Sequence, residues 1–170
     1  MARNDISYLA NADRHVSVGV GELAVAAYPS ILTTQALGSC VGIALWDPQR
    51  QAGGMAHVML PSSEDTRVDG KLQRFATHAV PELIAMLEAE GSPHRRLVAK
   101  IAGGAAMFKG DSMLASIGSR NVDEVCKQLH LAGVRLRAED TGGDFARTIE
   151  LHLDTGVLLV RSYQYGIREL

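Results

Sequence analysis

Residues 33–61 read TTQALGSCVGIALWDPQRQAGGMAHVMLP, and this stretch decides how the chain is expected to fold. An uninterrupted apolar run, Val41 to Trp46, follows Cys40 and ends at the turn residues Asp47-Pro48. A second, mainly apolar segment occupies residues 53–60. Two short apolar segments on either side of an Asp-Pro turn are typical of a β-hairpin, so we expect a hairpin at the centre of the fold.

The register of this hairpin determines whether its cysteine and its histidine meet. If the loop comprises residues 47–50, Trp46 lies opposite Gln51 and Cys40 lies opposite His57. Directly opposed residues share a face, with Cβ atoms about 4.5–5.5 Å apart, which allows a thiol–imidazole hydrogen bond. A shift of one residue would put the two side chains on opposite faces, and a bulge at the glycine pair of the second segment would change the count.

A cysteine beside a histidine is a candidate nucleophile. The ordinary thiol pKa is about 8.5, and a neighbouring imidazolium lowers it so that reactive thiolate is present near neutral pH. The alternative is that Cys40 is a small buried hydrophobic residue and that His57 is merely packed beside apolar strands. The spacing alone leaves both interpretations open, because cysteine–histidine signatures do not transfer between families.

Length and composition limit the classes of protein to which the chain can belong. The chain has 170 residues, 46% of them hydrophobic and only 5% aromatic, so we expect one domain, residues 1–170, with an aliphatic core. The polar, unpatterned residues 1–14 are expected to form a loose N-terminal arm. The net charge of −2 gives no basic surface for nucleic acid.

The same features predict where the protein resides. The N-terminus lacks the apolar core of a signal peptide, and no apolar run reaches the length of a membrane span. Two cysteines do not make a disulfide framework. We therefore expect a cytoplasmic protein that is not inserted in a membrane, needs no cofactor and holds no metal.

The rest of the chain combines strands with two helices. A helical stripe begins after Gly70, and Pro81 within it predicts a kink or two abutting helices. Asn121 and Glu124 have the spacing of a capping box, which predicts a helix from there to Leu131, with Cys126 as a core residue. Strands are expected at the alternating or buried apolar segments, namely residues 16–20, 22–27, 31–35, 97–101, 134–137, 148–153 and 157–160. This mixture predicts an α+β fold.

Further motifs follow the central stretch LGSCVGIALWDPQRQAGGMAHVMLP, namely KIAGGA at 100–105, IGSRN at 117–121 and AEDTGG at 138–143 followed by Arg147. Together these motifs resemble those of the CheD family, the chemoreceptor glutamine deamidases of bacterial chemotaxis. The resemblance spans roughly residues 16–160, with the motifs in the family's order. It departs from the family pattern at Gln35-Ala36, at Ala56, where asparagine is frequent, and at Ala146, which replaces a glycine.

The resemblance implies a fold and a catalytic set. The fold is two packed mixed β-sheets flanked by helices, in four layers α/β/β/α, as in cysteine hydrolases related to bacterial toxin deamidases. The catalytic residues are Cys40 as nucleophile, His57 as acid and base, and Thr34 as the group that orients the imidazole. We expect backbone N–H groups around Ser39 and Cys40 to bind the oxyanion, with Gly38 permitting the tight turn.

The resemblance also implies the substrate and the partners. The expected reaction converts specific glutamines on the cytoplasmic helices of chemoreceptors to glutamates through a thioester. Some members of the family are credited with an accessory methylesterase activity, and a CheC-type phosphatase is a further expected partner.

Two rival interpretations belong to other classes of protein. The first is a non-catalytic interaction module that binds the receptor or a CheC-type phosphatase. The second is a metal site made by Cys40 and His57 with Cys126 or another histidine. No Cys-x-x-Cys or His-x-x-x-His spacing supports a metal site.

Overall fold

The computed structural model of the chain describes residues 14–64 and 70–170, so almost all of the expected N-terminal arm lies outside the described residues. The strands form two mixed sheets. The first has the order β1 (His15–Ser17), β3 (Ile31–Leu37), β8 (Arg147–His152), β9 (Leu158–Ser162) and β10 (Gly166–Glu169). The second has the order β2 (Leu23–Ala27), β5 (Ala52–Val58), β4 (Val41–Asp47), β6 (Val98–Gly103) and β7 (Arg135–Thr141).

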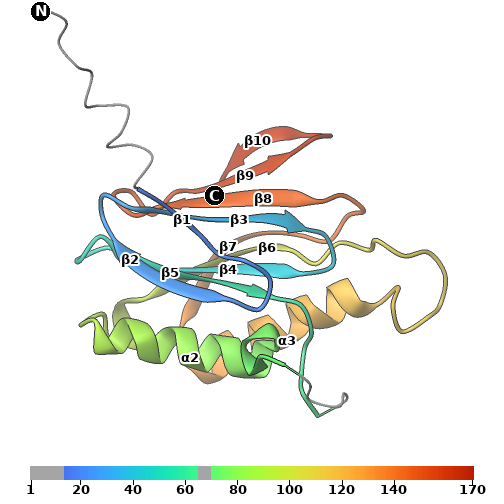
Figure 1. Ribbon diagram of the computed structural model, residues 1–170, viewed down its shortest axis with the longest axis horizontal. Helices are drawn as coiled ribbons and strands as arrows, with labels where there is room; N and C mark the ends of the chain where they lie inside the picture. Colours follow the sequence, from blue (N-terminus) through green and yellow to red (C-terminus); the bar gives the residue numbers. More distant parts are fainter. Residues whose placement is uncertain (1–13, 65–69) are drawn as a thin grey trace, which may run out of the picture.

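The two sheets pack face to face, and both α-helices lie over the outer face of the second sheet (Figure 1). These helices are α2 (Ala76–Ala89) and α3 (Ile117–Leu131), and two short 3-10 turns, η1 (Leu72–Arg74) and η2 (His94–Arg96), complete the regular elements. The expected α+β class with two packed mixed sheets is confirmed. Within the described residues the layers run sheet, sheet, helices, so the expected helical layer on the outer face of the first sheet is not found there.

The central hairpin has the expected strands but a different register. Asp47 pairs with Ala52, and Gly42, not Cys40, lies opposite His57. Trp46 pairs with Gly53, so the expected pairing of Trp46 with Gln51 is wrong. The loop still has four residues, now 48–51, and the pairing continues without a bulge through the glycine pair. Because the register moves by two residues and not one, each side chain keeps its expected face.

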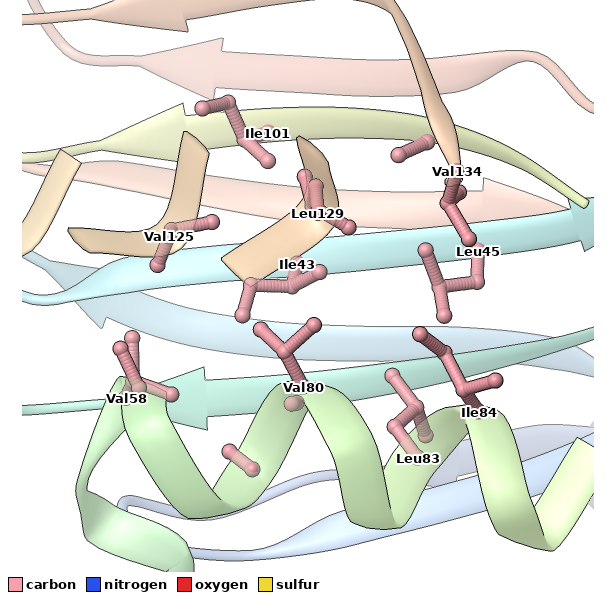
Figure 2. Close-up of a cluster of buried hydrophobic side chains, with 14 of the residues drawn as sticks. Ile43, Leu45, Val58, Val80, Leu83, Ile84, Ile101, Val125, Leu129 and Val134 are labelled. Atoms are coloured by element: carbon pink, nitrogen blue, oxygen red, sulfur yellow. The ribbon is translucent and has the colours of Figure 1, made fainter. Parts of the chain in front are cut away.

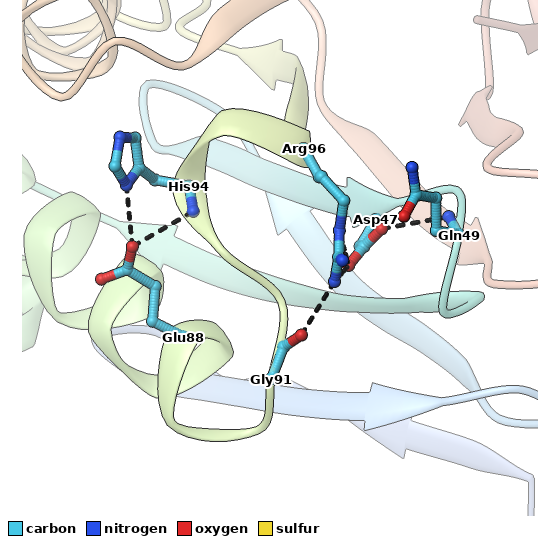
Figure 3. Close-up of polar contacts among 6 residues, drawn as sticks. All are labelled: Asp47, Gln49, Glu88, Gly91, His94 and Arg96. Atoms are coloured by element: carbon cyan, nitrogen blue, oxygen red, sulfur yellow. Dashed lines mark hydrogen bonds and ion pairs between the residues drawn. The ribbon is translucent and has the colours of Figure 1, made fainter.

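A buried carboxylate explains where the hairpin loop begins (Figure 3). Asp47 stays in the ladder and accepts a hydrogen bond from the Gln49 N–H at 3.0 Å. Its other oxygen accepts from Arg96 Nη2 at 2.7 Å, and the same guanidinium donates to the Gly91 carbonyl. Burial raises the pKa of Asp47, but the hydrogen bonds to its carboxylate outweigh burial and hold the pKa below its ordinary value. The loop is therefore tied to the segment that follows α2.

The central strands β4 and β5 of the second sheet are buried on both faces, which explains the uninterrupted apolar run of β4. Toward the helices, Ile43 and Val58 pack against Val80 of α2 and Leu129 of α3 (Figure 2). Toward the first sheet, alternate residues of the same strands, such as Ala44 and Met55, pack against side chains of β3, β8 and β9. The alternation sends neighbouring residues of β4 and β5 to different layers.

A bulge in β3 precedes the turn that carries Cys40. Thr34 pairs with Ile149 and Leu37 pairs with Arg147, so the two intervening residues of β3 oppose the single residue Thr148. Ala36, inside the bulge, has a positive φ of 57°. The extra residue lets Thr34 and Leu37 both point into the core although they are three positions apart.

Two helix boundaries differ from the expected ones. Pro81 lies inside a continuous α2, and the break that separates two abutting helical segments falls at Phe75, between η1 and α2. Helix α3 begins at Ile117, with Ser116 at its N-cap, so the expected capping box at Asn121 is wrong. Asn121 lies in the second turn of the helix and is completely buried.

Candidate active site

One side-chain hydrogen bond joins the two sheets at the candidate site. Thr34 of β3 and His57 of β5 lie in different sheets, and Thr34 Oγ1 is 2.8 Å from His57 Nδ1. The threonine hydroxyl also lies 2.6 Å from the Val18 carbonyl oxygen, which can only accept. Because the hydroxyl has one hydrogen and uses it to donate to the Val18 carbonyl, it must accept a hydrogen bond from Nδ1–H. Nδ1 therefore carries the hydrogen, and Nε2 of the neutral ring keeps a free lone pair.

The backbone of His57 is fixed as firmly as its ring. Its N–H donates to the Glu22 carbonyl at 3.2 Å, and its carbonyl accepts from the Gly21 N–H at 2.9 Å. The imidazole is 1% exposed, and Nε2 is buried without a hydrogen-bond partner in the described structure. A buried nitrogen with an unused lone pair is costly to maintain. It is also the group that a general base requires.

Cys40 lies on the same side of the second sheet as His57. Alternate positions of β4, including Ala44 and Trp46, pack toward the first sheet, and Cys40 packs against the same cluster. Its side chain is half-buried, so it remains accessible to a substrate. Within the described residues, Cys40 Sγ makes no hydrogen bond to His57. Such contacts are often long in unliganded enzymes and shorten in the complex.

The turn that contains Cys40 is held in place by hydrogen bonds to its backbone carbonyls. The Gly38 carbonyl accepts from the Ala105 N–H at 2.9 Å, and the Cys40 carbonyl accepts from the Gly104 N–H at 2.8 Å. The backbone can approach this closely because residue 103 is glycine. Gly103 has a φ of 112°, and a Cβ there would collide with the Cys40 carbonyl oxygen. The Gly-Gly-Ala loop therefore serves as the support of the cysteine turn.

Burial shifts both candidate reactive groups toward their neutral forms. Desolvation raises the pKa of the Cys40 thiol above its ordinary value, and its own backbone N–H opposes this only in part. Desolvation also lowers the pKa of His57 below its ordinary value. The expectation that an imidazolium lowers the thiol pKa is therefore not met in the unliganded protein. At neutral pH the site holds a thiol and a neutral imidazole, and His57 must remove the thiol proton during attack.

This protonation state predicts the pH profile of thiol alkylation. The rate at which iodoacetamide alkylates Cys40 is expected to rise with pH and to reach its midpoint at a higher pH than for an exposed cysteine, because only the thiolate reacts and burial disfavours it. Peptide mass spectrometry after timed alkylation measures the rate at Cys40 and at Cys126 separately. A plateau that begins below pH 8 at Cys40 would instead indicate a preformed thiolate–imidazolium pair.

The structure separates the other sequence candidates from this site. Cys126 packs against the core between the second sheet and the helices, as expected. Residues 14–64 and 70–170 contain no group of three or more His, Cys, Asp and Glu side chains arranged to hold a metal ion. No helix in these ranges is long and apolar enough to cross a membrane.

Sequence reasoning missed one residue at the site. Asn121 Nδ2 donates to the Ser39 carbonyl at 2.9 Å and to the Met59 carbonyl at 3.0 Å. It therefore connects the residue before Cys40 to a residue two positions after His57. The motif IGSRN contains this asparagine, but a capping interpretation accounted for it without a tertiary contact.

A half-buried thiol on the sheet face of a histidine–threonine pair is an arrangement expected of cysteine-dependent acyl-transfer enzymes. Similarity to known proteins identifies the family to which the chain belongs. The family model described as "CheD chemotactic sensory transduction" matches residues 59–162. The chain belongs to the CheD family.

Curated relatives match nearly the whole chain. The chain is 47% identical over 149 residues to "Chemoreceptor glutamine deamidase CheD" of Thermotoga maritima, covering 88% of this chain and 92% of that protein. It is 42% identical over 158 residues to "Probable chemoreceptor glutamine deamidase CheD 2" of Geobacter metallireducens, covering 91% of this chain and 98% of that protein. These matches extend beyond the segment that the family model covers.

A search of solved structures matches the Bacillus licheniformis hypothetical protein YfiH. That match has a TM-score of 0.48 and 16% sequence identity, and it covers 70% of this chain. It covers 49% of the YfiH chain, which is about half of its length.

Proposed function

We propose that this protein hydrolyses the side-chain carboxamide of chemoreceptor glutamines to glutamate, with Cys40, His57 and Thr34 as its catalytic set. One observation carries the assignment of roles. The hydrogen bond between His57 Nδ1 and Thr34 leaves Nε2 as an unprotonated base on the sheet face that Cys40 shares. The names of the curated relatives supply the substrate class.

The reaction begins with attack by the thiol. Cys40 Sγ bonds to the carboxamide carbon of the glutamine while its proton passes to His57 Nε2. The carbonyl π electrons move to the oxygen, which gives a tetrahedral intermediate with a negative oxygen. Thr34 accepts a hydrogen bond from the resulting imidazolium through Nδ1 and keeps the ring in one orientation.

The intermediate then collapses and water completes the reaction. His57 Nε2 returns its proton to the amide nitrogen, and the carbon–nitrogen bond breaks. Ammonia departs, and the acyl group remains bound to Cys40 as a thioester. Nε2 next removes a proton from water, which attacks the thioester and releases glutamate and the thiol. The same thioester would form from a glutamate methyl ester with loss of methanol, so the site suits an accessory methylesterase activity.

Backbone donors of the cysteine turn are proposed to bind the negative oxygen. Within residues 14–64 and 70–170, neither the Ser39 N–H nor the Cys40 N–H donates a hydrogen bond to another residue, so both are proposed as donors to a substrate oxygen. Two adjacent N–H groups form a concave anion site. Donors that are already oriented stabilise charge that develops in the transition state without reorganisation.

The proposed site suits a helical protein substrate better than a small molecule. Cys40 lies at a turn and is partly exposed, so a glutamine that projects from a long helix can reach it. The cytoplasm is the proposed place of action because the family's substrate glutamines lie on the cytoplasmic helices of chemoreceptors. A CheC-type phosphatase, the partner implied by the family, is proposed to compete for the same surface.

Mass spectrometry of a chemoreceptor cytoplasmic fragment incubated with the protein tests this function. The expected result is a mass gain at particular glutamines that corresponds to replacement of NH₂ by OH, with ammonia released in equal amount. The fragment incubated alone controls for spontaneous deamidation. If the fragment binds to the protein but its glutamines stay unchanged, the proposal fails and the interaction module replaces it.

A further inference from the structure

The cysteine turn, residues 38–40, is held in place through its backbone carbonyls. Three consecutive carbonyls, those of Gly38, Ser39 and Cys40, accept hydrogen bonds from the support behind the turn. Backbone N–H groups of the Gly-Gly-Ala loop bind the first and the third. The middle carbonyl, on Ser39, has a side-chain donor instead, Asn121 Nδ2 at 2.9 Å.

The Ser39 carbonyl is the one that controls the proposed oxyanion donor. It belongs to the same peptide group as the Cys40 N–H, and in a trans peptide the C=O and the N–H point in opposite directions. A donor that fixes the direction of the carbonyl therefore also fixes the direction of the N–H.

The position of Asn121 is fixed by the packing of α3. The first turn of α3 contacts the Gly-Gly-Ala loop so closely that a Cβ at Gly118 would collide with the Ala105 carbonyl oxygen. Asn121 follows in the next turn, is completely buried, and also donates to the Met59 carbonyl at 3.0 Å. Two carbonyl acceptors require the NH₂ of a carboxamide, because an oxygen in its place would be repelled by both.

We infer that Asn121 is a positioning residue that fixes the Ser39–Cys40 peptide, so that the Cys40 N–H faces the oxygen of the reacting carbonyl. The inference rests on the proposed role of Cys40 as nucleophile. Asn121 touches no reacting atom. It acts through the backbone of Ser39 on one side and of Met59, beyond His57, on the other.

Two reagents applied to the whole protein separate this role from a general structural one. Acetylation of Cys40 by p-nitrophenyl acetate passes through a tetrahedral oxyanion and releases p-nitrophenolate. Alkylation of Cys40 by iodoacetamide displaces iodide and forms no oxyanion. We expect Asn121→Ala to lower the ratio of the acetylation rate to the alkylation rate at least about tenfold, since loss of one oxyanion donor costs about 10²–10³ in rate.

The matched control is Val125→Ala, which removes a buried side chain one turn further along α3 and leaves the Ser39 contact intact. Its rate ratio is expected to equal that of the wild type. Mass spectrometry assigns each label to Cys40 or Cys126, and thermal unfolding confirms that each variant is folded during the assay. Asn121→Leu, which removes the donor but fills a similar volume, replaces the alanine variant if the latter does not fold, and its rate ratio is expected to fall by the same factor.

The outcomes distinguish this inference from the proposed function. An unchanged ratio in Asn121→Ala, or an equal fall in Val125→Ala, overturns the inference whether or not the wild type deamidates a receptor fragment. If the wild type is an active deamidase, Asn121→Ala is further expected to lower kcat at least about tenfold with KM little changed, because the interaction acts mainly in the transition state. A rise in KM with an unchanged kcat would also contradict the inference.

Discussion

A Cys40→Ala variant is expected to release no ammonia from a chemoreceptor fragment, with a rate at least about 10³-fold below that of the wild type. Loss of the sulfur removes the atom that forms the thioester, and no other described cysteine replaces it, because Cys126 packs into the core on the helix side of the second sheet. The measurement is ammonia release combined with peptide mass spectrometry of the fragment.

The affinity of the Cys40→Ala variant for the receptor fragment distinguishes the enzyme from the rival interaction module. Cys40 is half-buried at a turn, and removal of its sulfur leaves the backbone contacts of the turn unchanged. The Kd for the receptor fragment is therefore expected to match that of the wild type, as measured by titration calorimetry. Cys126→Ala is the control variant and should retain full activity. Deamidation by Cys40→Ala at the wild-type rate would remove Cys40 from the mechanism.

The second large effect is expected at the histidine. A His57→Gln variant should lose about 10²- to 10⁴-fold in kcat/KM for deamidation, which is the range attributed to a general acid and base. The loss should be severe because burial keeps the thiol protonated, so the reaction depends on a base to remove the proton. Rates are compared at pH 7 on protein whose folding is verified by circular dichroism.

Variants of Thr34 test whether the ring must be oriented. Thr34→Val removes the hydroxyl that accepts from Nδ1 and frees the imidazole to place its proton on Nε2, where it no longer acts as a base. Thr34→Ser keeps the hydroxyl and should retain most of the activity. If the valine and serine variants are equally active, the hydroxyl has no orienting role, and the His57 assignment must rest on the Gln variant alone.

The central hairpin illustrates how far local patterns reach. The apolar runs on both sides of Asp47-Pro48 located two buried strands, but not their register, which differs by two residues from the expected one. The register depends on whether Asp47 belongs to the strand or to the loop. Its carboxylate bonds to Gln49 and Arg96 while its backbone remains in the ladder. Arg96 lies 49 positions away, so no turn pattern could show that contact.

Strand β10 shows a second reason why the sequence pattern does not reveal every strand. All four of its residues are exposed, and it adds to the edge of the first sheet by pairing with β9. A strand without a buried face has no hydrophobic alternation, which is the signal used to predict strands. The tail of the chain therefore gave no expectation of a strand.

The sequence by itself determined the α+β class, most of the strands, and the face that Cys40 shares with His57. These depend on local periods of two and 3.6 residues, and a register shift of two preserves the face. Only the tertiary structure decided that Thr34 meets His57 across two sheets and that Asn121, 82 positions from Ser39, holds the cysteine turn. It also decided that burial keeps the thiol protonated. These features depend on the packing of distant segments, and desolvation is a property of the assembled core that no spacing along the chain encodes.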